Sequence, residues 1–183
     1  MTIPISRKTF TVADYYKMAE TGILKPEDRV ELLNGEIITM SPIESFHAGI
    51  VNYLCRILNE KLKVKATILP QNPIHLDSKS EPEPDIAIAK FSNDDYRSHH
   101  PNAEELFLVI EVADSSLAID RTVKTPLYAK AGIPEYWIVN IQDRQIEVFS
   151  KPENGAYQIS KVFKKGNLSC SSIEFDVMIG EVF

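Results

Sequence analysis

Apolar residues recur at helical spacing in the segment SPIESFHAGIVNYLCRILNEKL, which predicts a helix over most of this stretch. The apolar positions of the pattern are Ile43, Phe46, Ile50, Leu54, Ile57 and Leu58. Ser41 is the expected N-cap, Pro42 suits the first turn, and Glu44 completes a capping box with Ser41.

Before this helix, the pattern predicts a short helix and a β-hairpin. Thr11 can cap the short helix, which Gly22 is suited to end. In RVELLNGEIITM, the Asn-Gly pair at 34–35 separates two apolar runs, and this is a strong local signal for a hairpin. A two-residue turn at this pair places Glu31 opposite Ile38.

Strand-like runs dominate the rest of the chain. They lie at 64–69, 84–90, 106–113 and 136–140, with RQIEVFS and AYQISKVF as late antiparallel strands. A helical segment between the third and fourth strands is closed by Gly132 and Pro134. Pro126 either kinks this helix or restarts it with Thr125 as the cap. The order of elements predicts an α/β (α+β) fold, in which helices flank a mixed central sheet that an N-terminal hairpin precedes.

Length and composition are typical of one ordinary domain, which we expect to span residues 1–183. No apolar run approaches the length of a membrane span, and MTIPISRKTF lacks the features of a secretory signal. We therefore expect a soluble, cytoplasmic protein without membrane partners. Cys55 and Cys170 form no C-x-x-C pattern, which argues against a disulfide framework or a zinc site.

The formal net charge of −6 argues weakly against a broad nucleic-acid-binding face, because phosphate contacts depend on lysine and arginine. A group of metal-binding carboxylates would contribute negative charge that bound cations offset. Two lysine-rich patches, KLKVK at 61–65 and KVFKK at 161–165, are local basic candidates. Solvated edge strands explain both patches equally simply, since lysines on an edge discourage aggregation.

Two acidic residues interrupt strands that otherwise read as buried. Asp85 begins the apolar strand of PEPDIAIAK, and Glu111 follows the run LFLVI. A buried carboxylate is costly unless a proton, a cation or hydrogen bonds compensate it. If the two strands are neighbours, the two acids meet, and their oxygens suit Mg²⁺ or Mn²⁺. Alternatively, each acid caps a strand or pairs with a basic side chain.

These motifs resemble the PD-(D/E)XK nuclease superfamily, in which a lysine lies two residues after the second acid. That position is Ala113 here. The segment DRTVKTPLYAKAGIPEYW and the hairpin segment VELLNGEI are similar to the Uma-type family of putative restriction endonucleases, whose lysine has moved to the following helix. The resemblance implies a restriction-endonuclease-like fold and a functional set of Glu31, Asp85, Glu111 and Lys124. The segment EVADSS departs from the family, which commonly has serine and proline after the acid.

The spacing of the nearby lysines agrees with this assignment. Lys90 is an odd number of positions from Asp85 and faces the other side of a regular strand. Lys130 lies six positions beyond Lys124, which turns it away on a helix. Lys124 shares a helical face with Tyr128 if Pro126 leaves the turn intact, although a surface lysine remains the alternative.

Three aromatic or imidazole side chains have alternative roles. His47 lies one turn beyond Glu44 and can face the same cleft, or it can be an ordinary half-buried helix histidine. Tyr136 and Trp137 are expected to be core and dimer-surface aromatics instead of base-stacking platforms.

We therefore predict a Mg²⁺- or Mn²⁺-dependent endonuclease-like phosphodiesterase acting on nucleic acid, with DNA favoured over RNA. Asp85, Glu111 and the Val112 carbonyl are expected to hold the metal, with Glu31 assisting through a water or a second ion. Lys124 is expected to orient or deprotonate the attacking water. The alternative is a catalytically silent homodimer with the nuclease fold, acting as a DNA-binding or protein-interaction module. We expect a homodimer in either case.

Overall fold

The computed structural model describes residues 7–183. Residues 1–6, part of the N-terminal segment assessed above for a secretory signal, lie outside this range. The helices are α1 (Val12–Glu20), α2 (Ser45–Leu62), α3 (Leu117–Ile119) and α4 (Thr125–Ala131). The strands are β1 (Val30–Leu33), β2 (Glu36–Thr39), β3 (Ala66–Pro70), β4 (Ile86–Lys90), β5 (Leu106–Ala113), β6 (Glu135–Asn140), β7 (Gln145–Glu153), β8 (Ala156–Phe163), β9 (Asn167–Ser169) and β10 (Asp176–Met178).

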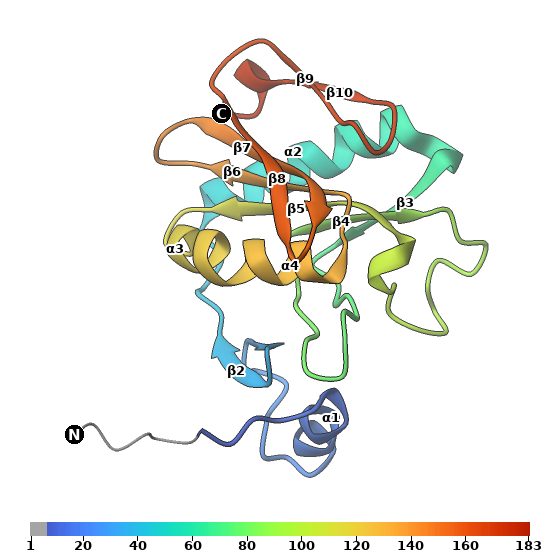
Figure 1. Ribbon diagram of the computed structural model, residues 1–183, viewed down its shortest axis with the longest axis vertical. Helices are drawn as coiled ribbons and strands as arrows, with labels where there is room; N and C mark the ends of the chain where they lie inside the picture. Colours follow the sequence, from blue (N-terminus) through green and yellow to red (C-terminus); the bar gives the residue numbers. More distant parts are fainter. Residues whose placement is uncertain (1–6) are drawn as a thin grey trace.

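A mixed sheet forms the centre of the described chain, with six strands in the order β3-β4-β5-β6-β7-β8. Strands β5 and β6 pair in parallel, with the helical segment 117–131 as their crossover. The other neighbours are antiparallel. Figure 1 shows α2 and the β9–β10 hairpin on one face of this sheet and α3 and α4 on the other. The predicted fold class is confirmed.

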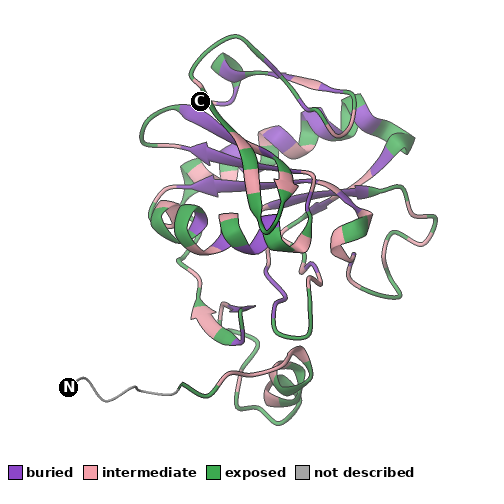
Figure 2. Ribbon diagram, in the orientation of Figure 1, coloured by how far each residue is buried: buried purple, intermediate pink, exposed green. Residues whose placement is uncertain are grey.

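Both faces of the central strands are buried because each carries its own apolar core (Figure 2). On one face, side chains of β4, β5 and β6 pack with Leu54 and Leu58 of α2 and with the C-terminal segment. On the other face, Tyr128 of α4 packs with Tyr136 and Ile138 of β6. A polar side chain on β5 is therefore shielded from solvent whichever way it points.

The predicted hairpin is present, with Glu31 opposite Ile38 as expected. The loop that precedes β4 holds the hairpin in place. The Gly35 N–H donates to the Lys79 carbonyl at 2.7 Å, and the Glu81 N–H donates to the Leu32 carbonyl at 2.9 Å. These bonds fix β1 beside the segment that leads into the start of β4.

The segment 117–131 is helical throughout, but its turns differ in width. Short α3 leads into a π-helical turn, η3 (Asp120–Lys124), and then into α4, which ends at Gly132 in the left-handed conformation with φ of 80°. Pro126 has no N–H to donate, and the widened turn directly precedes it. Thr125 is therefore not a cap: α4 begins at Thr125 as a direct continuation of the π-helical turn, with Lys124 in the N-cap position.

Two local predictions are wrong, the capping of α2 by Ser41 and an edge strand at 61–65. Ser41 does not cap α2: the helix begins at Ser45 with Glu44 as N-cap and no side-chain capping bond. Ser41 is instead held by long-range contacts, since its carbonyl accepts from Arg29 and its hydroxyl from Ser115. Residues 61–65 are the end of α2 and a 3-10 turn instead of an edge strand, whereas 161–163 do lie on the edge strand β8.

The two aromatic residues of β6 belong entirely to the core. Tyr136 and Trp137 are both 0% exposed, so neither is available to a dimer surface in this fold. Across residues 7–183, no helix combines the length and apolar character needed to span a bilayer.

The tight approach at Gly35 gives a test of how the hairpin is held. Gly35 has φ of 78°, and a Cβ there would lie 2.7 Å from the Thr9 Cβ and 2.9 Å from the Phe10 carbonyl oxygen. We expect Gly35→Ala to lower the free energy of unfolding by about 3 kcal/mol, because steric overlap adds to the cost of positive φ.

Gly22 is the matched control, since its φ is 75° but a Cβ there would meet nothing within 4 Å. Gly22→Ala should cost only about 1 kcal/mol. Urea denaturation measures both values, and equal losses would contradict the close packing around Gly35.

Candidate functional site

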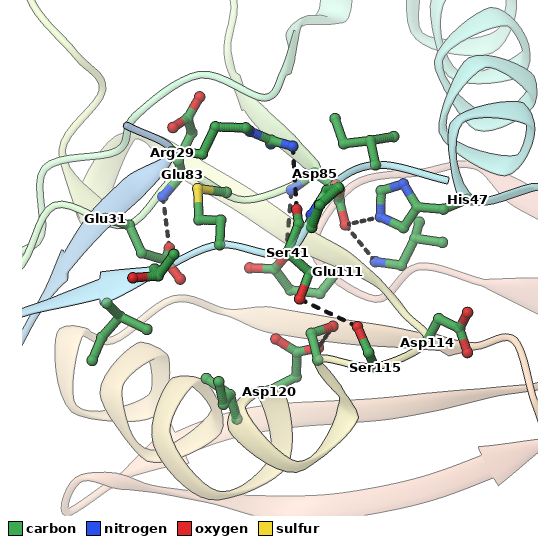
Figure 3. Close-up of a pocket in the computed structure, with 18 of the residues that line it drawn as sticks. Arg29, Glu31, Ser41, His47, Glu83, Asp85, Glu111, Asp114, Ser115 and Asp120 are labelled. Atoms are coloured by element: carbon green, nitrogen blue, oxygen red, sulfur yellow. Dashed lines mark hydrogen bonds and ion pairs between the residues drawn. The ribbon is translucent and has the colours of Figure 1, made fainter. Parts of the chain in front are cut away.

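A cleft of about 320 Å³ opens between the hairpin, the first turns of α2 and the ends of β4 and β5. Of the described residues that line it, seven carry carboxyl groups, whereas Arg29 and Lys124 are the two permanent cations. The acidic residues are Glu31, Glu44, Glu83, Asp85, Glu111, Asp114 and Asp120. Figure 3 shows acidic side chains that reach the cleft from separate segments of the chain, among them Glu31, Asp85 and Asp120. The negative charge at this site therefore exceeds what its own basic groups neutralise.

Lys124 lies at the centre of an ion network in this cleft. Its Nζ is 3.0 Å from Glu111 Oε1 and 3.1 Å from Glu31 Oε1, and the three side chains are only 5–6% exposed. The Tyr128 hydroxyl donates to the same Glu111 oxygen at 2.9 Å. Lys124 and Tyr128 therefore share a helical face, as predicted, because Pro126 leaves the turn between them intact.

Asp85 and Glu111 meet because β4 and β5 are antiparallel neighbours. Asp85 directly precedes β4, and its backbone N–H donates to Glu111 Oε2 at 3.4 Å. The Val112 N–H donates to Asp85 Oδ2 at 2.8 Å. The N–H and C=O of one residue in an antiparallel strand point toward the same neighbouring strand, so the Val112 carbonyl also points to the side of β5 on which β4 lies.

Glu31 joins the site through the hairpin. Its Oε1 pairs with Lys124, and its Oε2 accepts a hydrogen bond from the Glu83 N–H at 3.1 Å. Both oxygens of Glu31 are thus engaged by protein groups, which leaves it less free than Asp85 to bind a further ligand directly.

The ion network contains one ammonium, that of Lys124, and two carboxyl groups, those of Glu31 and Glu111. Burial raises the pKa of Glu111 well above its ordinary value, although the Lys124 charge opposes that rise. Burial lowers the pKa of Lys124, but the carboxylates of Glu111 and Glu31 outweigh it and raise that pKa above its ordinary value. One ammonium balances one of the two carboxylates, and the remaining charge calls for a proton or a bound cation.

Two of the other acids that line the cleft, neither selected by sequence reasoning, have raised pKa values. Asp120 is 1% exposed, accepts a hydrogen bond from the Ser116 hydroxyl at 2.7 Å, and has its pKa raised by burial to about 6. Burial also raises the pKa of Glu83. The signal for Asp120 was its position four residues before Lys124, on the same side of a helix.

His47 faces the cleft, which is one of the two alternatives predicted for it from the sequence. Its Nε2 lies 3.0 Å from Asp85 Oδ2, and the hydrogen bond with Asp85 is the main cause of the raised pKa of His47 (Figure 3). Spacing from Glu44 predicted the direction of the side chain, but the partner could be known only from the fold.

The other candidate lysines do not reach this site. Lys90 and Lys130 are exposed, while Ala113, the position of the lysine in the wider superfamily, is a buried core residue. The four residues Glu31, Asp85, Glu111 and Lys124 are thus brought together around one cleft, and Lys124 is the lysine that contacts the acids.

The available donors fit a hard divalent cation. Hydrogen bonds among residues 7–183 leave Asp85 Oδ1 unused, and Glu111 Oε2 accepts only the long bond from Asp85 N. No three His, Cys, Asp or Glu side chains in that range form a metal-binding group, so the donors are two carboxylates with the Val112 carbonyl. Mg²⁺ commonly binds through one or two carboxylates while keeping several waters.

Comparisons with known proteins agree with this description. A family model, Uma2, described as "Putative restriction endonuclease", matches residues 12–176. A crystal structure described as a "putative nuclease belonging to DUF820" from Anabaena variabilis ATCC 29413 is similar in fold, with a TM-score of 0.72 and 16% sequence identity. The match covers 95% of this chain and 97% of that chain. No curated protein matches the sequence.

Removing the buried ammonium should destabilise the protein. In Lys124→Met, Glu31 and Glu111 remain buried without their common partner, and we expect a loss of about 3–5 kcal/mol in the free energy of unfolding near pH 8. Protonation of a carboxyl with a raised pKa relieves this cost, so the deficit should shrink as the pH falls toward 5.

Lys130→Met on the exposed side of α4 is the control and should change stability by less than about 0.5 kcal/mol. Denaturant titrations at several pH values measure both variants. A Lys124→Met deficit that is small or independent of pH would contradict the ion network.

Proposed function

The chain belongs to the Uma2 family of "Putative restriction endonuclease" proteins, and we propose that it is a divalent-metal-dependent endonuclease that hydrolyses phosphodiester bonds in DNA. The observation that carries the proposal is the lysine of the helix after β5, paired with two acids beside Asp85 in one cleft. The nuclease-like fold and family support the reaction class, and the finer assignments follow from the chemistry of the site.

Asp85, Glu111 and the Val112 carbonyl are the residues that would hold Mg²⁺ or Mn²⁺. Such an ion, when bound, makes a water a better nucleophile and neutralises charge on the phosphate. Glu111 must then lose the proton that its raised pKa favours, and the excess of acids in the cleft supports an exchange of that proton for a cation.

Lys124 has a second role once Glu111 turns toward a cation. Its ammonium remains charged and sits within reach of the site, so it can orient the attacking water and stabilise negative charge on the phosphate. Glu31 keeps Lys124 in place through its 3.1 Å ion pair and assists through a water or a second ion.

A catalytically silent nuclease-fold homodimer is the alternative function. It is favoured by the complete engagement of Lys124 with Glu31 and Glu111 and by the formal net charge of −6. Such a protein would bind DNA or another protein without cleaving a phosphodiester bond.

Cleavage assays separate the two functions. Duplex DNA, single-stranded DNA and RNA are each tested with Mg²⁺ or Mn²⁺; the unaltered protein should cleave DNA in preference to RNA, and EDTA should stop the reaction. Asp85→Asn and Glu111→Gln should each lower the rate by roughly 100-fold or more, because each removes a charged metal donor.

Lys124→Ala should cause a loss of similar size, roughly 100-fold, whereas Lys130→Ala on the exposed face should cleave almost normally. Thermal melting shows which variants are folded at the assay temperature. Equal losses at both lysines would indicate general attraction to phosphate. Failure of the unaltered protein to cleave any of these nucleic acids would favour the silent module.

A further inference from the structure

His47 contacts Asp85 from α2, whereas Asp85 itself directly precedes β4 and Glu111 lies in β5. His47 lies in the first turn of α2, and its Nε2 is 3.0 Å from Asp85 Oδ2. The two side chains are 15% and 14% exposed, so the contact is largely shielded from water. An ionised carboxylate only accepts hydrogen bonds, which requires the hydrogen of the imidazole to be on Nε2.

The contact completes the hydrogen bonding of one Asp85 oxygen. Oδ2 accepts from His47 Nε2 at 3.0 Å and from the Val112 N–H at 2.8 Å. No hydrogen bond within residues 7–183 uses Oδ1. Two donors from opposite elements, one on α2 and one on β5, fix the plane of the carboxylate and leave one oxygen for a ligand.

The other nitrogen of His47 argues against a purely structural role. Nδ1 is buried and has no hydrogen-bond partner among the described residues. Most buried polar atoms in proteins are paired, and leaving one unpaired costs free energy. That cost is accepted at a site where Nε2 donates to Asp85, because a hydrogen on Nε2 leaves Nδ1 as the bare acceptor of the neutral ring.

We propose that His47 is a positioning residue that holds Asp85 through Nε2–H, so that Asp85 binds the divalent cation through Oδ1 alone. This inference rests on the proposed function and assigns a residue that acts through a metal ligand. Partners of this kind around ligating carboxylates typically change metal affinity by roughly 10–100-fold when removed.

Two isosteric substitutions isolate the donor. The amide nitrogen of His47→Gln can occupy the place of Nε2, whereas that of His47→Asn reaches only the place of Nδ1. Mn²⁺ affinity is measured by calorimetry for the unaltered protein and both variants, and thermal melting of the metal-free proteins reports stability. We expect His47→Gln to stay within about 3-fold of the unaltered protein and His47→Asn to lose roughly 10–100-fold, at similar metal-free stability.

The outcomes separate this inference from the function on which it rests. If the unaltered protein binds Mn²⁺ and the two variants keep its affinity, or lose it equally, the positioning role is overturned while the metal site stands. If the unaltered protein binds no Mn²⁺, the metal-dependent function is overturned and the role of His47 falls with it.

Discussion

One buried ammonium between two buried carboxylates is the constraint around which this protein is arranged. Lys124, Glu31 and Glu111 are each almost fully shielded, and each comes from a different part of the chain. Unpaired, any of the three would cost several kcal/mol. The hairpin must therefore reach the segment that leads into the start of β4, and the helix after β5 must present its lysine inward. The loop bonds to Gly35 and Leu32 and the π-helical turn before Pro126 accompany these two placements.

The same network explains why the cleft suits a cation. A single lysine cannot neutralise both acids, and burial raises the pKa of Glu111 well above its ordinary value. Asp85 stands beside Glu111 with one oxygen saturated by His47 and Val112 and the other unused. In the proposed function, the stability of the fold and the affinity for a cation therefore depend on the same carboxylates. The family and fold of the chain are consistent with that chemistry.

Much of the site could be predicted from the sequence because its residues depart from the pattern of the elements that carry them. Asp85 and Glu111 interrupt apolar strands, and the Asn-Gly turn sets the register that places Glu31. Strand parity and helical spacing exclude Lys90 and Lys130 and leave Lys124. Local pattern failed where long-range contacts decide the conformation. Ser41 bonds to Arg29 and Ser115 instead of capping α2.

The remaining features depend on tertiary packing that no local pattern encodes. The widened turn at Asp120, the burial of that acid and the contact of His47 with Asp85 all arise where distant elements meet. A sequence can indicate that a histidine faces a cleft, but its partner follows from how the first turn of α2 is placed beside the residue that precedes β4.

Anomalous diffraction from crystals grown with Mn²⁺ would locate a cation bound between the two carboxylates. We expect one strong peak within ligand distance of Asp85 Oδ1 and Glu111, with Lys124 still paired to Glu31. Absence of a peak between these carboxylates at saturating Mn²⁺, with Lys124 still bridging Glu31 and Glu111, would contradict the proposed metal site.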